Sequence, residues 1–194
     1  MVAAGSGSRF GGPKQYSSLD GQRVLDLSVA AARAVAAGVV LVVPADRVAD
    51  PEKDVDCVVA GGVTRSDSVR AGLEAIPPDA DVVIVHDAAR PWATAALFRA
   101  VVAALDRADG AVPGVPLTDT VKRVRDGRVT DTLDRAELVT VQTPQAFRAA
   151  VLRRAHTAFG DATDDAALVE AVGGVVVVVP GEAANVKITT AGDL

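Results

Sequence analysis

The sequence predicts an α/β fold in three layers, in which a mainly parallel, Rossmann-like sheet lies between two layers of helices. Three observations support this prediction. Apolar runs rich in valine alternate with helical segments along the chain. The valine runs show little polar alternation, which is typical of strands covered on both faces. The chain of 194 residues is long enough for one well-buried domain and marginal for two. We therefore expect residues 1–194 to form a single domain.

Glycine and proline mark the boundaries of the elements expected in the first half of the chain. In order, these elements are a very short strand at Val2–Ala4, a helix at Val24–Ala37, strands at Val39–Val43 and Cys57–Ala60, a helix at Ser66–Ile76 with Ser66 as its cap, and a strand at Val82–His86. Pro44 ends the second strand, and Pro77 stops the helix because proline has no N–H to donate.

The second half continues this alternation but contains one different segment. The expected regular elements are a helix at Thr94–Arg107, a strand at Gly110–Val115, helices at Ala146–Ala158 and Asp165–Val172, and a strand at Val175–Val179. Between them, Thr120–Arg125 and Arg128–Thr132 predict a β-hairpin that reverses at Asp126–Gly127. Many of its residues are polar or charged, so it cannot be buried on both faces. We expect a projecting arm, about residues 118–135, that contacts a partner chain.

Charge and cysteine content restrict the possible functions. The formal net charge of −5 argues against a general affinity for nucleic acid or anionic membranes. An anionic ligand would therefore need a local cluster of cations. The single cysteine, Cys57, excludes an internal disulfide and suits a reducing compartment. We expect no signal peptide, and no apolar run approaches the roughly 20 residues of a membrane span, so we expect a cytoplasmic protein. Both ends are short for this pattern, and we expect clipped termini.

The glycine-rich segment from Gly5 to Lys14 is the strongest functional signal. Four glycines in eight positions allow the backbone to turn sharply and present its N–H groups to an anion. Arg9 offers a planar fork to phosphate oxygens, and Lys14 a point charge. A mobile surface loop is the alternative. The dinucleotide and P-loop motifs both fail here, because Gly11–Pro13 stands where the first needs a helix and Gln15 follows Lys14 where the second needs Ser or Thr.

Other segments carry further candidates. Asp87 follows the central strand and so points to the edge where open α/β sheets bind ligands. Asp87 would orient a substrate hydroxyl or contact a metal, and Arg90 would bind a phosphate. The alternative is that the two residues form an Asp–Arg pair that caps the next helix. Gly61 and Gly62 precede a helix, and their lack of side chains would let a flat base approach the backbone closely. The alternative is that they form a simple turn before the helix cap. Lys187 stands among apolar residues, where burial would be costly without an anionic partner.

The ordered set of segments resembles the 2-C-methyl-D-erythritol 4-phosphate cytidylyltransferase family over nearly the whole chain. These segments are A-A-G-S-G-S-R with P-K-Q, G-G-x-x-R-x-D-S-V, V-H-D-A-A-R-P, L-T-D-T-V-K, D-R, Q-T-P-Q-A-F and N-V-K-I-T. The resemblance implies a nucleotidyltransferase fold and transfer of CMP from CTP to methylerythritol phosphate, with release of pyrophosphate and a requirement for Mg²⁺ or another divalent cation. It also implies a homodimer formed through the hairpin arm.

The resemblance also assigns residues to roles. It implies catalytic roles for Arg9, Lys14, Arg135 and Lys187; nucleotide binding by Ala4, Gly5, Ser6, Gly7, Gly62 and Ser68; binding of the second substrate by Asp87, Ala88, Arg90, Thr120, Arg135, Thr143 and Lys187; and a metal contact by Asp87. Val63 departs from the acidic or polar residue common at its position, so a contact there would use its backbone. Some of the second-substrate residues would reach the site from the other subunit.

Three alternatives remain open. A ribitol-5-phosphate cytidylyltransferase would share the nucleotide half and much of the second site. A sugar-phosphate nucleotidyltransferase that uses another nucleotide is disfavoured by the short chain. A non-catalytic nucleotide sensor would not need both Arg9 and Lys14.

Overall fold

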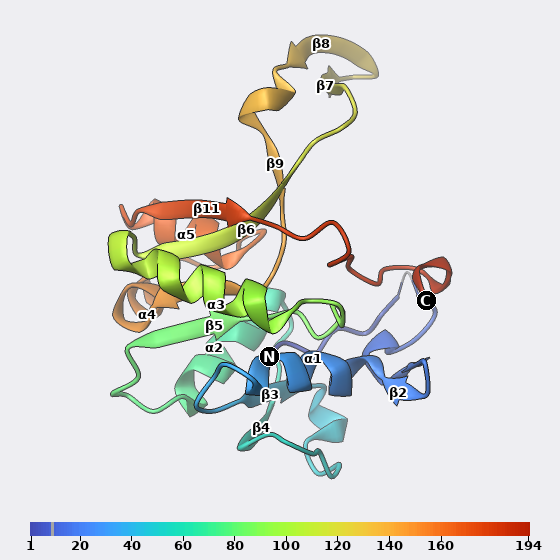
Figure 1. Ribbon diagram of the computed structural model, residues 1–194, viewed down its shortest axis with the longest axis vertical. Coiled ribbons are helices and arrows are strands. Elements are labelled where there is room, and N and C mark those ends of the chain that lie inside the picture. Colours follow the sequence, from blue (N-terminus) through green and yellow to red (C-terminus); the bar gives the residue numbers. More distant parts are fainter. Residues whose placement is uncertain (9) are drawn as a thin grey trace.

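The computed structural model describes residues 1–8 and 10–194 and has the three layers expected from the sequence (Figure 1). The helices are α1 (Val24–Arg33), α2 (Arg65–Ala75), α3 (Ala95–Ala103), α4 (Ala149–Ala158) and α5 (Asp165–Ala171). The strands of the main sheet are β3 (Val40–Val43), β4 (Cys57–Ala60), β5 (Val82–Val85), β6 (Gly110–Pro116), β9 (Val139–Val141), β10 (Gln145–Arg148) and β11 (Val176–Pro180). A two-residue pair, β1 (Ser18–Leu19) and β2 (Gln22–Arg23), precedes α1.

The sheet is mixed and mainly parallel. β5, β10, β6 and β11 are hydrogen-bonded neighbours in that order, and β3 pairs with β4. Val2 joins the two groups through parallel bridges to Val42 of β3 and to Asp87, just after β5. β10 runs antiparallel to both of its neighbours, whereas β11 is parallel to β6 and β4 to β3. The carboxyl ends of β3, β5 and the Val2 segment therefore meet at one edge, which is where an α/β sheet binds ligands.

The expected first strand at Val2–Ala4 is reduced to the bridges of Val2. On the amino-terminal side of this bridge, β3 and β5 are separated by an apolar cavity of about 740 Å³, lined in part by Met1, Val40 and Ile84. The amino group of Met1 donates to the carbonyl of Val40 at 2.9 Å. Burial lowers the pKa of this amino group to about 6.

The helix predicted at Ala146–Ala158 is wrong at its start. Gln145–Arg148 forms β10, and α4 begins at Ala149. Ala146 and Phe147 are both fully buried but face opposite sides of the sheet, in separate clusters of the core. Sequence reasoning read three residues of a short strand as helix because their partners, β5 and β6, lie far away in the chain.

Other boundaries differ by a few residues. α1 ends at Arg33, four residues before the expected Ala37, and α3 passes into a 3₁₀ turn at Ala104–Arg107. The cap of α2 is Thr64 instead of Ser66. The Thr64 hydroxyl accepts from the backbone N–H of Asp67, and the Asp67 carboxylate accepts from the N–H of Thr64, which is a complete capping box.

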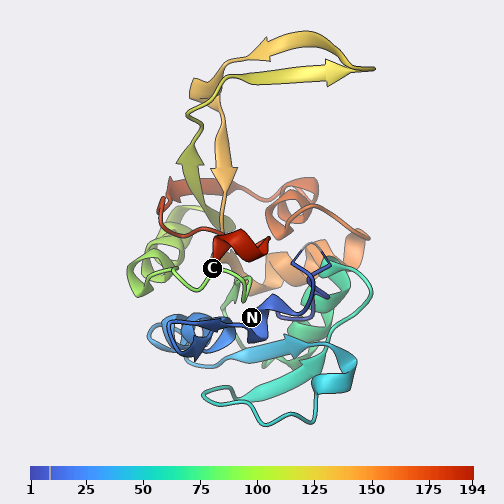
Figure 2. The same cartoon turned by 90° about the vertical axis from the view of Figure 1, so that its right-hand side faces the viewer.

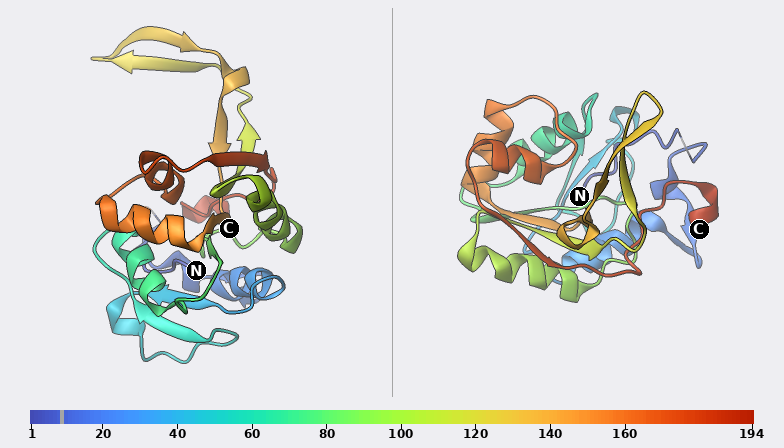
Figure 3. Two further views of the ribbon diagram at one scale, coloured as in Figure 1. Left: turned by 90° about the vertical axis from the view of Figure 1, so that its left-hand side faces the viewer. Right: turned by 90° about the horizontal axis from the view of Figure 1, so that it is seen from above.

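Helices cover both faces of the sheet. α2, α4 and α5 pack on one face around Phe147 and Leu152, whereas α1 and α3 pack on the other around Leu25 and Phe98. The alternation of β5, in which Val83 and Val85 share one cluster while Ile84 contacts the opposite ones, is the period of two expected of a strand covered on both sides. Figure 3 shows the helices on either side of the sheet.

The predicted hairpin is present and projects from the body of the molecule (Figure 2). β7 (Val121–Arg125) pairs antiparallel with β8 (Arg128–Leu133), and Asp126 and Gly127 both have the positive φ that the turn requires. Val124 and Val129 in these strands are 55% and 61% exposed. No helix among residues 1–8 and 10–194 is long and apolar enough to cross a bilayer.

Candidate active site

A cavity of about 430 Å³ opens where four segments of the chain meet at the edge of the sheet. Its walls come from the glycine-rich loop (residues 3–8 with Lys14 and Gln15), the segment from Gly62 to Ser68 that starts α2, the residues from Asp87 to Ala89 after β5, and Lys187 with Thr189 near the end of the chain. Its volume lies in the range of ligand pockets. The structure thus brings together predicted site residues from four parts of the sequence: Ala4, Gly5, Ser6, Gly7, Lys14, Gly62, Ser68, Asp87, Ala88 and Lys187.

The glycine-rich loop is held by its own backbone. The carbonyl of Gly7 accepts from the N–H groups of Phe10, Gly11 and Gly12. Gly7 has a φ of +67°, and a Cβ there would stand 1.7 Å from the carbonyl oxygen of Gly12, so only glycine fits. Lys14 begins a 3₁₀ turn, Lys14–Tyr16, and lines the cavity. Arg9 lies outside the described residues.

Gln15 is a residue of this site that sequence reasoning missed. Its amide is buried and donates to the carbonyls of Ala3 at 2.6 Å and Gly5 at 3.2 Å. It therefore ties the end of the loop to its beginning. The P-K-Q segment includes Gln15, but nothing adjacent in the sequence shows that its amide is buried against the start of the loop.

The second wall of the cavity is the turn that leads into α2. The Ser68 hydroxyl accepts from the N–H of Gly62 at 3.2 Å and donates to the carbonyl of Thr64 at 3.0 Å. A Cβ on Gly61 would stand 2.3 Å from that of Ala4, so glycine lets this turn approach the first loop. Val63 is fully exposed at the cavity. The turn is thus a rigid backbone wall with an apolar side chain at its rim.

Asp87 and Lys187, 100 residues apart in sequence, form the polar centre of the cavity. The Lys187 Nζ donates to the Asp87 Oδ2 at 2.6 Å, and the Arg65 Nε stands 3.4 Å from the Oδ1. Burial alone would raise the pKa of Asp87, but the charges of Lys187 and Arg65 more than offset it and lower that pKa well below its usual range. Asp87 is therefore ionised at neutral pH.

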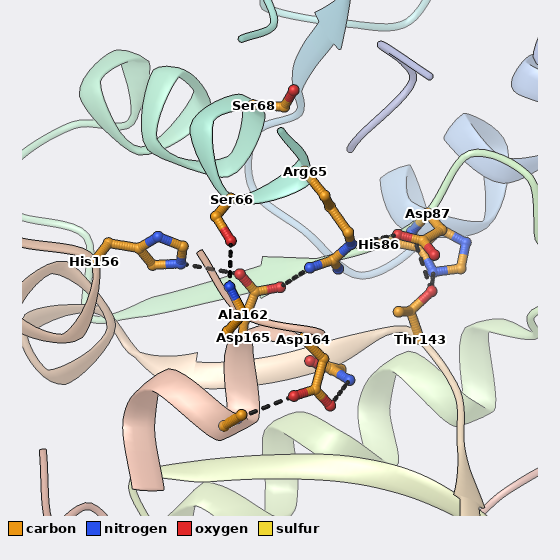
Figure 4. A network of polar contacts seen from close by, with 12 residues as sticks. Arg65, Ser66, Ser68, His86, Asp87, Thr143, His156, Ala162, Asp164 and Asp165 are labelled. Atoms are coloured by element: carbon orange, nitrogen blue, oxygen red, sulfur yellow. Dashed lines mark hydrogen bonds and ion pairs between the residues drawn. The ribbon is translucent and has the colours of Figure 1, made fainter. Parts of the chain in front are cut away.

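Thr143 and His86 lie behind Asp87, in the buried part of the structure (Figure 4). The Thr143 hydroxyl accepts from the backbone N–H of Asp87 at 3.1 Å and lies 3.0 Å from the His86 Nδ1. Burial lowers the pKa of His86 to about 3. His86 is therefore uncharged at neutral pH and lies in the buried structure behind Asp87.

This arrangement predicts an acid-sensitive fold. The pKa of His86 is about 3 when folded and about 6.5 when unfolded, so between these pH values the unfolded chain binds one more proton and stability falls as pH falls. In His86→Asn, the pH dependence of the unfolding free energy between pH 4 and 6 should be weaker by up to about 1.4 kcal/mol per pH unit. Urea unfolding at several pH values measures it. An identical pH dependence in both proteins would contradict the neutral assignment.

The chain has clear relatives of known family along its whole length. The family model for 2-C-methyl-D-erythritol 4-phosphate cytidylyltransferase matches residues 1–194. The chain belongs to this cytidylyltransferase family. It is similar to the crystal structure of the cytidylyltransferase of that name from Thermus thermophilus, with a TM-score of 0.85 and 36% identity over 99% of this chain and 92% of the other.

Cytidylyltransferase relatives also include longer proteins. This chain is 47% identical to a bifunctional enzyme IspD/IspF from Clavibacter michiganensis subsp. michiganensis, over all of this chain and 52% of that protein. It resembles the structure of the bifunctional IspDF from Campylobacter jejuni with a TM-score of 0.86, at 28% identity, over 100% of this chain and 52% of the other. The chain spans about half the length of the curated relatives that it matches.

Four residues that the cytidylyltransferase resemblance singled out do not line the cavity. Thr143 is buried, with its hydroxyl bound as described, and the Arg90 guanidinium donates to the carbonyl of Asn185 at 2.7 Å, two residues before Lys187. Thr120 and Arg135 are exposed near the ends of the hairpin arm, where Arg135 donates to the carbonyl of Thr118. Asp87 and Arg90 do not form the alternative capping pair, because the cap of α3 is Thr94.

The acidic side chains of this cytidylyltransferase fold limit where a divalent cation can bind. Asp87 is the one carboxylate among the described residues that line the cavity. Residues 1–8 and 10–194 contain no group of three or more His, Cys, Asp or Glu side chains suited to hold a metal. One carboxylate beside a glycine-rich loop does suit Mg²⁺, which commonly binds through one or two carboxylates and the phosphates of its substrate. The residues present therefore fit a metal that arrives with a nucleotide.

Proposed function

We propose that this chain transfers the CMP moiety of CTP to 2-C-methyl-D-erythritol 4-phosphate and releases pyrophosphate. The observation that carries the proposal is the shared cavity, in which the glycine-rich loop, the turn before α2 and the Asp87–Lys187 pair face one another. The family match over the whole chain and the likeness to the Thermus thermophilus enzyme support the choice of substrates. A cytoplasmic location is part of the proposal and agrees with the single cysteine.

The glycine-rich loop would hold the triphosphate. Its backbone is exposed at Gly5 and Ser6, so N–H groups are accessible to phosphate oxygens. Lys14 at the end of the loop would stabilise the negative charge that grows on the phosphoryl oxygens, together with Arg9. Gly62 and Ser68 would hold the cytosine and the ribose against the second wall, with Val63 contributing only its backbone.

Lys187 would hold the phosphate of the second substrate opposite this loop. Asn185, which is fully buried, fixes the approach to Lys187: its amide donates to the carbonyl of Thr143 at 2.9 Å, and its own carbonyl accepts from Arg90. Thr143 and Arg90 would thus act mainly by holding Asp87 and Lys187 in place. The attacking phosphate is already an anion, so the reaction needs positioning of two polyanions and no strong general base.

Asp87 would hold a divalent cation, as the fit of its surroundings suggests. Asp87 would be its protein ligand, and Mg²⁺ would supply a positive charge that reduces the repulsion between the two substrates. The chain's own part is to present one ionised carboxylate at the cavity, which the cations on either side of Asp87 ensure.

We also propose that the protein is a homodimer in which the arm of one subunit reaches the cavity of the other. Arg135 and Thr120 are exposed and outside the cavity of their own chain. The exposed Val124 and Val129 give the arm an apolar surface, which projecting hairpins normally bury against a partner. A symmetric pair would place two arms on two cavities at once.

Complementation between inactive variants tests this dimer. We expect Lys14→Ala and Arg135→Met to be nearly inactive alone, but a refolded equimolar mixture should recover about one quarter of wild-type turnover, because half of the dimers would then hold one intact cavity of two. The intact cavity combines Lys14 of one copy with Arg135 of the other. If Arg135 served its own cavity, every cavity would carry one defect and the mixture would stay inactive.

The function itself is tested by pyrophosphate release. With CTP, Mg²⁺ and methylerythritol phosphate we expect turnover, and without the second substrate we expect only background. Ribitol 5-phosphate in its place measures specificity. A clear preference for ribitol 5-phosphate would overturn the assigned acceptor while it would leave the cytidylyltransferase reaction intact.

A further inference from the structure

We propose that Arg65 is a positioning residue, which holds the Asp87 carboxylate from behind so that Lys187 is released to bind the phosphate of the second substrate. This inference rests on the proposed function and deepens it. Arg65 lies in the G-G-x-x-R-x-D-S-V segment and lines the cavity, yet the family resemblance assigns it no role. It is the first residue of α2, directly after the Thr64 cap.

Arg65 bridges two carboxylates that come from distant parts of the chain. Its Nε faces the Asp87 Oδ1 at 3.4 Å, and its Nη1 donates to the Asp165 Oδ2 at 2.7 Å. Figure 4 shows the guanidinium between these two side chains. A planar guanidinium can serve two carboxylates in fixed directions at once, whereas a lysine amine binds as a single point charge.

The anchor behind Arg65 is rigid. Asp165 begins α5, its side chain is 1% exposed, and its Oδ1 lies 2.9 Å from the Nε2 of the buried His156 on α4. Both oxygens of Asp165 therefore have partners, which a buried carboxylate requires. Through this anchor, two helices that pack on the same face of the sheet fix the direction from which Arg65 approaches the cavity.

The two cations on Asp87 differ in freedom of movement. The Lys187 side chain is 42% exposed, and its ammonium group lies at the end of a flexible stem, so it can turn toward a ligand. Arg65 is 25% exposed and tied to Asp165, so it stays in place. In the structure, the Asp87 carboxylate contacts both cations. When a substrate phosphate competes for Lys187, Arg65 remains to balance the charge of Asp87, and the buried carboxylate is not left alone.

Loss of Arg65 should therefore weaken one substrate more than the other. With Lys187 as its only remaining cationic side chain, Asp87 would retain the lysine more strongly, and the incoming phosphate would have to displace a closer ion pair. We expect the KM for methylerythritol phosphate to rise about tenfold, as for the loss of one charge-assisted hydrogen bond. The KM for CTP should change by less than about twofold, because the glycine-rich loop does not depend on this contact.

The test must separate positioning from folding. Arg65→Met alone leaves Asp165 buried with one partner fewer and should lower Tm. The double variant Arg65→Met/Asp165→Asn removes that buried charge as well, so its Tm should recover while the raised KM for methylerythritol phosphate persists. Arg65→Lys, which keeps the charge, should give an intermediate KM. Arg70→Met is the matched control, since Arg70 lies on α2 and pairs with Asp67 outside the cavity.

Two measurements decide whether Arg65 positions Asp87 or only stabilises the fold. They are pyrophosphate release at varied concentrations of each substrate and thermal unfolding of every variant. A raised KM for methylerythritol phosphate alone, present in the double variant whose Tm has recovered, supports the positioning role of Arg65. A wild-type KM in the double variant overturns it and leaves Arg65 as a structural ion pair. Absence of turnover in the wild type overturns the proposed function itself, together with this role.

Discussion

Lys14→Ala should lower kcat on the order of 10²- to 10³-fold while it leaves the fold intact. Lys14 lines the cavity at the end of the glycine-rich loop, where the phosphoryl oxygens of a bound triphosphate would lie. A cation in this position stabilises charge that develops only during transfer, so its loss should affect kcat more than the KM for CTP. Steady-state pyrophosphate release measures both constants.

The control for this prediction is Lys53→Ala, because Lys53 is exposed and does not line the cavity. Its kinetic constants should match those of the wild type. Circular dichroism and Tm of both variants would show whether the loop change affects folding. Near-normal pyrophosphate release by Lys14→Ala, in a folded protein, would remove Lys14 from the mechanism.

Asp87→Asn should have an effect of similar size, a loss of at least about 100-fold in kcat/KM. The substitution keeps the shape of the side chain but removes the one carboxylate among the described residues that line the cavity. Lys187 and Arg65 would then face each other without the charge that now separates them. We also expect the Mg²⁺ concentration for half-maximal activity to rise, since the proposed metal would lose its protein carboxylate.

Asp56→Asn is a matched control for this change. Asp56 also forms a close ion pair, with Arg33 at 2.7 Å, but at an exposed site outside the cavity. Its variant should retain wild-type turnover and Mg²⁺ dependence. Wild-type Mg²⁺ dependence in Asp87→Asn would instead show that the metal binds elsewhere, and it would leave Asp87 a role in the orientation of Lys187 alone.

Much of the site could be predicted because its signals are local. The glycine-rich loop, the turn before α2 and the strand-end Asp87 each carry their chemistry within a few consecutive residues, and the structure places all three at one cavity. The hairpin arm was predictable for the same reason: Asp126–Gly127 specifies the reversal, and the polar strands exclude burial. Its role between subunits remains a prediction.

Residues that act through distant partners were harder to see. β10 was predicted as helix, because its backbone pairs only with β5 and β6. Gln15 and Arg65 were passed over, although both belong to quoted motifs, because nothing adjacent in sequence shows what they bind. Thr143 was expected to contact substrate, whereas its hydroxyl is bound to His86 and to the backbone of Asp87.

By itself, the sequence determined the class of fold, the glycine-rich character of the first loop and the residue types available for chemistry, since these depend on periodicity, glycine content and motifs within short segments. The tertiary structure decided which charges meet. Lys187 reaches Asp87 and Arg65 reaches Asp165 across 100 residues each. Such pairs form only when the packed sheet and helices bring separate segments together, because in the unfolded chain the entropy of closing loops of this length opposes every one of them.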